Sequence, residues 1–188
     1  MNLPWRQIPN AITVLRIILV APIVYFLAKE AYQQALWLFV IAGVSDALDG
    51  YLARHFNWAS RFGAITDPLA DKALLVAVYI TLTVNGLLPV WLIAIVFARD
   101  AIIVAGALTY HMVIGTYSMR PSIWGKLSTF SQITYVLILV LNETVITMPG
   151  WSLWGGLWVV AGLCCISGGH YLMTWGYKFM VAWRAKKS

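Results

Sequence analysis

The sequence predicts an all-α integral membrane protein with six transmembrane helices and a short N-terminal interfacial helix. Three observations support this fold class. The 188 residues are 61% hydrophobic and only 11% charged, and the mean hydropathy is +0.79, which is too apolar for an ordinary soluble domain. Apolar segments long enough to cross about 30 Å of hydrocarbon recur along the whole chain. Short connections containing turn residues separate these segments.

The predicted spans follow one another without an internal repeat or a soluble linker, so we expect a single domain over residues 1–188. Residues 1–8 precede the first span, and Trp5 and Arg6 are typical of an interfacial element. We do not expect a signal peptide followed by a soluble domain, because apolar segments continue toward the C-terminus. The six spans are expected near residues 10–28, 33–54, 69–85, 89–112, 124–141 and 153–176.

The distribution of basic residues predicts the orientation in the membrane. With a cytoplasmic N-terminus, eleven of the thirteen lysines and arginines lie on the cytoplasmic side, whereas Lys29 lies outside and Arg99 lies within the fourth span. We therefore expect both termini and the active site to face the cytoplasm, in a bacterial inner membrane. The excess of basic residues on the cytoplasmic side accounts for the net charge of +6, so we do not expect a nucleic-acid partner.

Acidic residues are scarce, and four of the seven lie at the cytoplasmic ends of two neighbouring spans. Asp46 and Asp49 are three residues apart, and Asp67 and Asp71 are four apart, so each pair shares one helix face. An intramembrane carboxylate is disfavoured by roughly 2.5–3.5 kcal/mol, and clustering adds repulsion, so four together require a cation. Oxygen ligands favour Mg²⁺ or Mn²⁺, which we expect as a pair of ions.

The residues between the two acidic pairs suit a ligand that contains phosphate. Gly50 lets such a ligand approach the backbone closely, and Arg54 has a planar guanidinium that matches a diphosphate. Ser60 keeps the connecting loop small and polar. Asp67 and Pro68 are expected to start the third span, as an N-cap followed by proline at the first helical position.

The stretch from Asp46 to Asp71 reads D-x-x-D-G-x-x-A-R-x8-G-x-x-x-D-x-x-x-D, and it resembles the signature of the CDP-alcohol phosphatidyltransferase family at every fixed position. The resemblance implies a six-helix membrane fold, often homodimeric, that uses a CDP-linked lipid. It also implies that Asp46, Asp49 and Asp67 bind metal, and that Asp71 both touches metal and serves as the base that deprotonates the acceptor hydroxyl. Gly50, Arg54 and Ser60 would contact the CDP group.

The likeness extends beyond the signature to about residues 8–132. The segment IPNAITVLRI at 8–17 resembles the opening of bacterial phosphatidylglycerophosphate synthases and of mitochondrial-type cardiolipin synthases. This likeness makes Asn10, Thr13 and Arg16 candidates for the border of the nucleotide site. Further along the chain, Arg99, Arg120 and Lys126 are candidate anchors for an acceptor phosphate.

Two acceptors fit this pattern. Family members that use glycerol 3-phosphate carry R-E and a second arginine eight residues after the first, whereas this chain has Asp100 after Arg99, and Ala107 at the later position. The R-D pair is more similar to the cardiolipin synthases. We therefore expect phosphatidyl transfer from CDP-diacylglycerol to phosphatidylglycerol, giving cardiolipin and CMP, with glycerol 3-phosphate as the alternative acceptor. A divalent-cation transporter is a remote alternative. A transporter would place carboxylates along a path near mid-membrane, whereas these four aspartates lie at the cytoplasmic ends of two spans.

Overall fold

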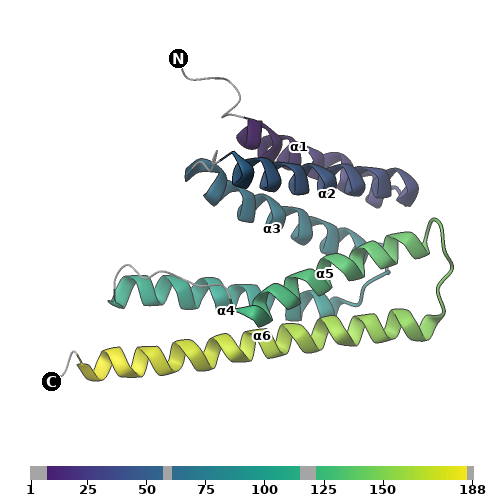
Figure 1. Cartoon of the computed structure of the whole chain (residues 1–188). Coiled ribbons are helices and arrows are strands. Elements are labelled where there is room, and N and C mark those ends of the chain that lie inside the picture. The colour runs from purple at the N-terminus through teal and green to yellow at the C-terminus, as the bar shows by residue number, and fades with distance from the viewer. Residues whose placement is uncertain (1–7, 57–60, 115–121, 186–188) are drawn as a thin grey trace, which may run out of the picture. The chain divides into compact units, whose positions relative to one another are not determined.

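The computed structural model contains six α-helices and no β-strand among the residues that it describes, which are 8–56, 61–114 and 122–185. The helices are α1 (Ile8–Ala28), α2 (Tyr32–His55), α3 (Arg61–Val84), α4 (Val90–Ile114), α5 (Ile123–Asn142) and α6 (Gly150–Ala185), as labelled in Figure 1. Within these helices, the side chains of residues 8–13, 46, 47, 49–54, 61–71, 107, 108, 110, 111, 113, 114 and 177–185 are not described. The predicted all-α fold class is confirmed, and each helix overlaps one of the six predicted segments.

Two helices are long and apolar enough to cross a bilayer, as judged over the described residues. They are α5, with 20 residues, and the 27-residue part of α6 from Gly150 to Gly176. Val14–Ala28 in α1 and Lys72–Val84 in α3 are shorter apolar stretches. Length and composition thus support two spans, and the six-span topology stays a prediction.

Helix α3 begins earlier than the sequence predicted. It starts at Arg61, so Asp67 and Pro68 lie within the helix and do not form its N-cap and first position. Hydropathy marks the part of a helix that suits hydrocarbon, but the helix itself continues through less apolar residues wherever its backbone hydrogen bonds are made. For the same reason α6 continues to Ala185, beyond its expected end near residue 176.

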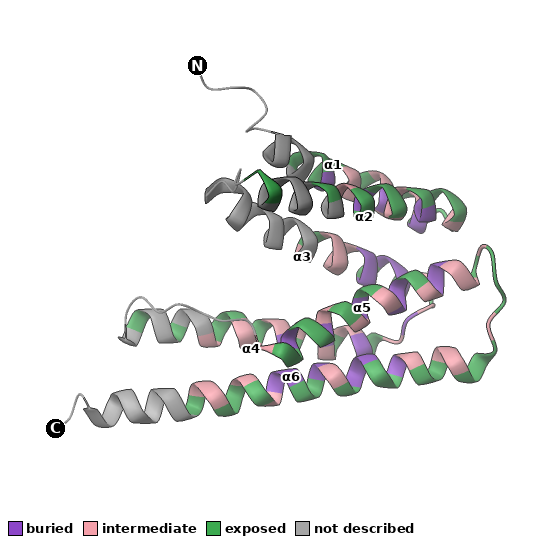
Figure 2. Ribbon diagram, viewed as in Figure 1, coloured by how far each residue is buried: buried purple, intermediate pink, exposed green. Residues whose placement is uncertain are grey.

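The first of two compact units contains α1, α2 and α3, together with Leu139–Thr147. Helix α1 packs against both α2 and α3. Figure 2 shows buried and exposed positions alternating along the described parts of α1 and α2, as expected where one face of a helix is packed. The buried apolar residues of the three helices are Ile23, Leu27, Ala35, Leu36, Ala42, Val78, Tyr79 and Leu82.

Asn85 connects the three helices at one end of this unit. Its Nδ2 donates to the carbonyl oxygen of Leu27 at 2.7 Å and to the hydroxyl of Tyr32 at 3.4 Å. Leu27 lies in the last turn of α1, Tyr32 begins α2, and Asn85 follows α3. Helices α1 and α3 therefore run parallel to each other and antiparallel to α2. The other end of the unit contains the C-terminal end of α2 and the N-terminal ends of α1 and α3.

The second unit contains α4, the part of α5 up to Ile138, and α6. Helices α4 and α6 pack against each other and run parallel, because residues further along α4 contact residues further along α6. The ring centroids of Trp91 and Trp158 are 5.3 Å apart, and later in both helices the indole of Trp175 lies 3.6 Å from the position that a β-carbon on Gly106 would occupy. Such close approach is typical of a helix pair with a small residue in its interface.

Helix α5 runs antiparallel to α6. Near the start of α5 the Ser128 hydroxyl lies 3.3 Å from Cys164 Sγ, and later in α5 the Tyr135 hydroxyl donates to the carbonyl of Leu153 at 3.1 Å. The buried residues of α6 recur every three or four positions, which gives this helix one packed face (Figure 2). They are Leu157, Val160, Ala161, Cys164, Ser167 and Gly168.

Replacing Gly156 by alanine should destabilise the second unit. A β-carbon at Gly156 would lie 2.8 Å from ring atoms of Tyr135, so either the ring or the α5–α6 packing must shift. Overpacking of this kind costs about 1–3 kcal/mol and should lower the thermal unfolding midpoint in detergent by several degrees. Gly155→Ala is the matched control, because no atom lies within 4 Å of the position that its β-carbon would occupy. An equal drop for both variants would contradict the proposed contact.

Candidate functional site

The four aspartates of the signature lie on two consecutive helices of the first unit. Asp46 and Asp49 belong to the C-terminal half of α2, and Asp67 and Asp71 belong to the N-terminal half of α3. Residues 56–60, which join these helices, can span about 20 Å at most. The fold therefore brings both acidic segments to the same end of the unit.

Most of the predicted ligands lie outside the described residues. This holds for the side chains of Asn10, Thr13, Asp46, Asp49, Gly50, Arg54, Asp67 and Asp71, and for the whole of Ser60 and Arg120. Among the described side chains, no group of three or more His, Cys, Asp or Glu residues is arranged to hold a metal ion. The metal site therefore stays a prediction. The structure describes the backbone of α2 and α3, but not the side chains of the four aspartates.

Arg16 is one predicted site residue that the structure does describe. It is buried in α1, with only 2% of its surface exposed. A buried guanidinium needs acceptors or negative charge near it, since a charge without compensation costs several kcal/mol. The end of α1, the start of α2 and the end of α3 meet at Asn85. Measured along the helix axes from that end of the unit, Arg16 lies within about one helical turn of Asp46 and Asp71. A buried cation on α1 is thus at the height of the predicted carboxylates.

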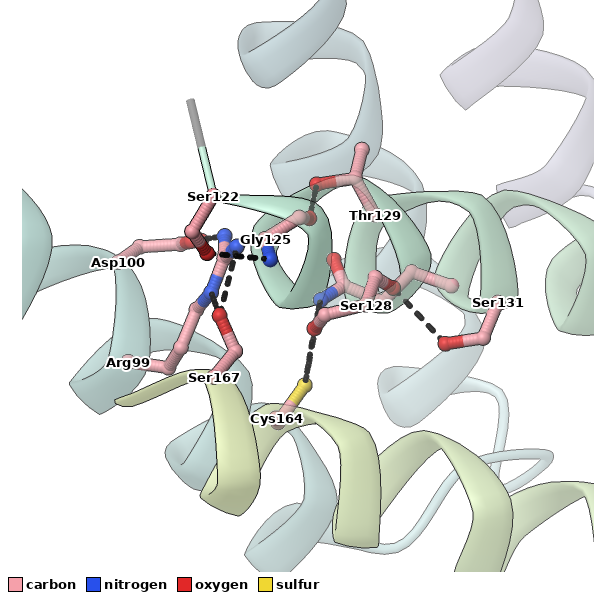
Figure 3. Close-up of polar contacts among 10 residues, drawn as sticks. Arg99, Asp100, Ser122, Gly125, Ser128, Thr129, Ser131, Cys164 and Ser167 are labelled. Carbon is pink, nitrogen blue, oxygen red and sulfur yellow. Dashed lines mark hydrogen bonds and ion pairs between the residues drawn. The ribbon is translucent and has the colours of Figure 1, made fainter. Parts of the chain in front are cut away.

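The second unit contains a buried polar cluster around Arg99, shown in Figure 3. Arg99 belongs to α4 and is only 8% exposed. Its Nε and Nη2 each donate to the hydroxyl of Ser167 in α6 at 3.2 Å, and Nη2 also donates to the carbonyl of Gly125 in α5 at 3.1 Å. Its Nη1 forms an ion pair with Asp100 Oδ1 at 2.8 Å. One guanidinium therefore links three helices.

The first turn of α5 is held by contacts with α4 and α6. Ser122 caps the helix, since its hydroxyl accepts the backbone N–H of Gly125 at 3.1 Å. The hydroxyl of Tyr171 in α6 accepts the backbone N–H of Ser122 at 3.3 Å. A β-carbon on Gly125 would lie 3.3 Å from both Arg99 Nη2 and the Tyr171 hydroxyl, so a residue without a side chain suits this position. The next residue, Lys126, is exposed.

A second buried polar group lies further along α5. Ser128, Gln132 and Cys164 are at most 1% exposed, and Gln132 Nε2 donates to Ser128 Oγ at 3.3 Å and to Cys164 Sγ at 3.2 Å. The polar contacts of Cys164 are a finding of the structure. No carboxylate or imidazole belongs to these three residues, so the group suits helix pairing rather than acid–base chemistry.

Sequence reasoning did not single out Ser167 or Gly125, which both bind Arg99. The spacing of residues in α6 could have indicated a face that packs against other helices. Ser167 and Gly168 follow Cys164 by three and four residues and precede Tyr171 by four and three, which places small and polar residues on one helix face. The partner of such a face in a helix bundle is not readable from the spacing alone.

Comparison with known proteins adds independent information. The family model described as CDP-alcohol phosphatidyltransferase matches residues 6–164. A cardiolipin synthase (CMP-forming) of Rattus norvegicus is 42% identical over 105 residues, which are 54% of this chain and 34% of that protein. A putative cardiolipin synthase of Mycobacterium tuberculosis is 30% identical over 171 residues, which are 90% of this chain and 78% of that protein.

A CDP-diacylglycerol–glycerol-3-phosphate 3-phosphatidyltransferase of Bacillus subtilis is also similar, with 32% identity over 155 residues, 80% of this chain and 74% of that protein. The alignment with the rat protein spans about a third of its length, whereas the two bacterial alignments span about three quarters of theirs. The relatives thus carry two kinds of name, cardiolipin synthase and glycerol-3-phosphate 3-phosphatidyltransferase. The family match covers the signature and most of the chain, and the chain therefore belongs to the CDP-alcohol phosphatidyltransferase family, a family of transferases.

Proposed function

We propose that this chain transfers the phosphatidyl group of CDP-diacylglycerol to the hydroxyl of phosphatidylglycerol, giving cardiolipin and CMP. The observation that carries this proposal is the complete signature from Asp46 to Asp71, on two consecutive helices of a CDP-alcohol phosphatidyltransferase family member. Similarity to cardiolipin synthases of rat and Mycobacterium tuberculosis supports the choice of acceptor.

The four aspartates would hold a divalent cation and provide the base. Asp46, Asp49, Asp67 and Asp71 offer only oxygen donors, a set that suits two Mg²⁺ or Mn²⁺ ions. Such ions, when bound, supply positive charge for the diphosphate and for the departing CMP. Asp71 accepts the proton of the acceptor hydroxyl as that oxygen attacks the β-phosphorus of the CDP-lipid. The bond from this phosphorus to the bridging oxygen breaks, and CMP leaves.

The nucleotide would be bound by residues on α1 and α2 and in the loop that follows α2. Arg16 supports this assignment, because a buried cation on α1 lies at the level of the acidic segments. Gly50 allows close approach of the diphosphate, and Arg54 offers a fork of N–H donors. The proposed contacts to the CDP group are Asn10, Thr13, Arg16, Gly50, Arg54 and Ser60.

Two features favour phosphatidylglycerol over glycerol 3-phosphate as the acceptor. The arginine that glycerophosphate-using members carry eight residues after Arg99 is replaced by Ala107. In addition, the Arg99 guanidinium is engaged by Asp100, Gly125 and Ser167. Arg120 and Lys126 remain as proposed anchors for the acceptor phosphate. Glycerol 3-phosphate stays the second candidate, because the Bacillus subtilis relative is named for it.

We further propose a single six-span domain that forms a homodimer, with both termini and the active site on the cytoplasmic side of a bacterial inner membrane. The distribution of basic residues supports this orientation. The two helices that are long and apolar enough to cross a bilayer support membrane insertion.

The acceptor can be tested directly with purified protein in mixed micelles. Given CDP-diacylglycerol, a divalent cation and either acceptor, the protein should form cardiolipin from phosphatidylglycerol with a kcat/KM at least about tenfold above that for glycerol 3-phosphate. Both products should disappear when the metal is chelated. Product formed from glycerol 3-phosphate alone would rule out phosphatidylglycerol as the acceptor.

The roles of the aspartates predict two different defects. Asp71→Asn removes the base and should lower kcat by about 10²–10⁴-fold while CDP-diacylglycerol still binds. Asp46→Asn removes a metal ligand and should raise the Mg²⁺ concentration for half-maximal activity by roughly tenfold or more. Glu143→Gln is the control, since this exposed carboxylate belongs to neither site. Wild-type turnover in either aspartate variant would refute its assigned role.

A further inference from the structure

We propose that Arg99 is a positioning residue for acceptor recognition: together with Ser167 and Tyr171 it sets the first turn of α5, from which Lys126 reaches the acceptor phosphate. This inference rests on the proposed function. It replaces the direct phosphate contact expected for Arg99 from the sequence by an indirect role.

The donors of Arg99 are largely used within the protein. A guanidinium has five N–H donors. Four hydrogen bonds engage them: two with Ser167, one with the Gly125 carbonyl and one with Asp100, at 2.8 to 3.2 Å. A phosphate could accept two hydrogen bonds from this guanidinium only by displacing one of these acceptors, and each buried polar group left without its partner carries a desolvation penalty. The contacts therefore favour a structural link over a substrate contact.

The link ends at the first turn of α5. Arg99 binds the carbonyl of Gly125, and Tyr171 binds the backbone N–H of Ser122, so both the start and the end of this turn are tied to neighbouring helices. The amide of Lys126 donates to the carbonyl of Ser122 at 3.2 Å within the same turn. Because the side chain of Lys126 is exposed, a shift of this turn moves a cation that is accessible to a ligand.

Ser167 offers the sharpest test of an indirect role. Its exposed fraction is 0%, so it has no surface with which to touch an acceptor. A change in acceptor affinity on removing its hydroxyl is therefore indirect, and Arg99 is the residue that donates hydrogen bonds to this hydroxyl. Tyr171 gives a second, milder route, since Tyr171→Phe removes only the hydroxyl that holds Ser122.

The experiment measures steady-state kinetics and amide hydrogen exchange of the full chain in mixed micelles. Ser167→Ala and Tyr171→Phe should each raise KM for phosphatidylglycerol roughly five- to tenfold, with kcat and KM for CDP-diacylglycerol within about twofold of wild type. Exchange at the amides of Gly125 and Lys126 should become faster. Ser131→Ala is the matched control, because that hydroxyl donates to the Ser128 carbonyl of its own helix, and it should change neither readout.

Arg99→Lys separates charge from geometry. Lysine keeps the positive charge but lacks the fork that joins Ser167 to Gly125, so the variant should show the same rise in KM as Ser167→Ala. Near wild-type KM in Arg99→Lys, or unchanged KM and exchange in both Ser167→Ala and Tyr171→Phe, would overturn the positioning role. Wild-type protein that makes no cardiolipin would instead overturn the proposed function, and with it the acceptor part of this inference.

Discussion

A guanidinium removed from water must find acceptors within the protein, and this requirement organises the second unit around Arg99. The acceptors come from α5 and α6, while the arginine itself belongs to α4. Its hydrogen bonds are complete only when all three helices are in place. Separating one helix would leave a buried charge without part of its compensation, at a cost of several kcal/mol. The cluster therefore makes the pairing of these helices specific, where apolar contacts alone would tolerate sliding.

The first unit also has to compensate charge, but there the predicted cluster is negative. If the four signature aspartates converge as proposed, four negative charges from α2 and α3 lie close together. Because like charges in a low-dielectric site strongly disfavour ionisation, divalent cations are the simplest means of keeping all four carboxylates ionised. A diphosphate brings further negative charge, which increases the need for metal. The acidic composition of the proposed site thus agrees with a metal-dependent reaction of a diphosphate.

Much of the fold was predictable because hydrophobic segments of membrane length mark helices clearly. The helix that contains Arg99 and Asp100 lies where it was expected, and the all-α class is confirmed. The start of α3 at Arg61 and the end of α6 at Ala185 were not predicted, because hydropathy reports burial in hydrocarbon and not the extent of backbone hydrogen bonding. Sequence spacing identifies residues on one helix, but it does not reveal partners on another.

The partners of Arg99 illustrate that limit and bear on the choice of acceptor. From sequence alone, an arginine in a span is a candidate phosphate ligand, and only the contacts with Ser167 and Gly125 show that its donors are engaged. A phosphate monoester such as glycerol 3-phosphate carries close to two negative charges at neutral pH, whereas a phosphodiester carries one. With Arg99 engaged and Ala107 in place of a second arginine, fewer cations are available to compensate a monoester. This charge balance is the reason why the proposed acceptor is a phosphodiester.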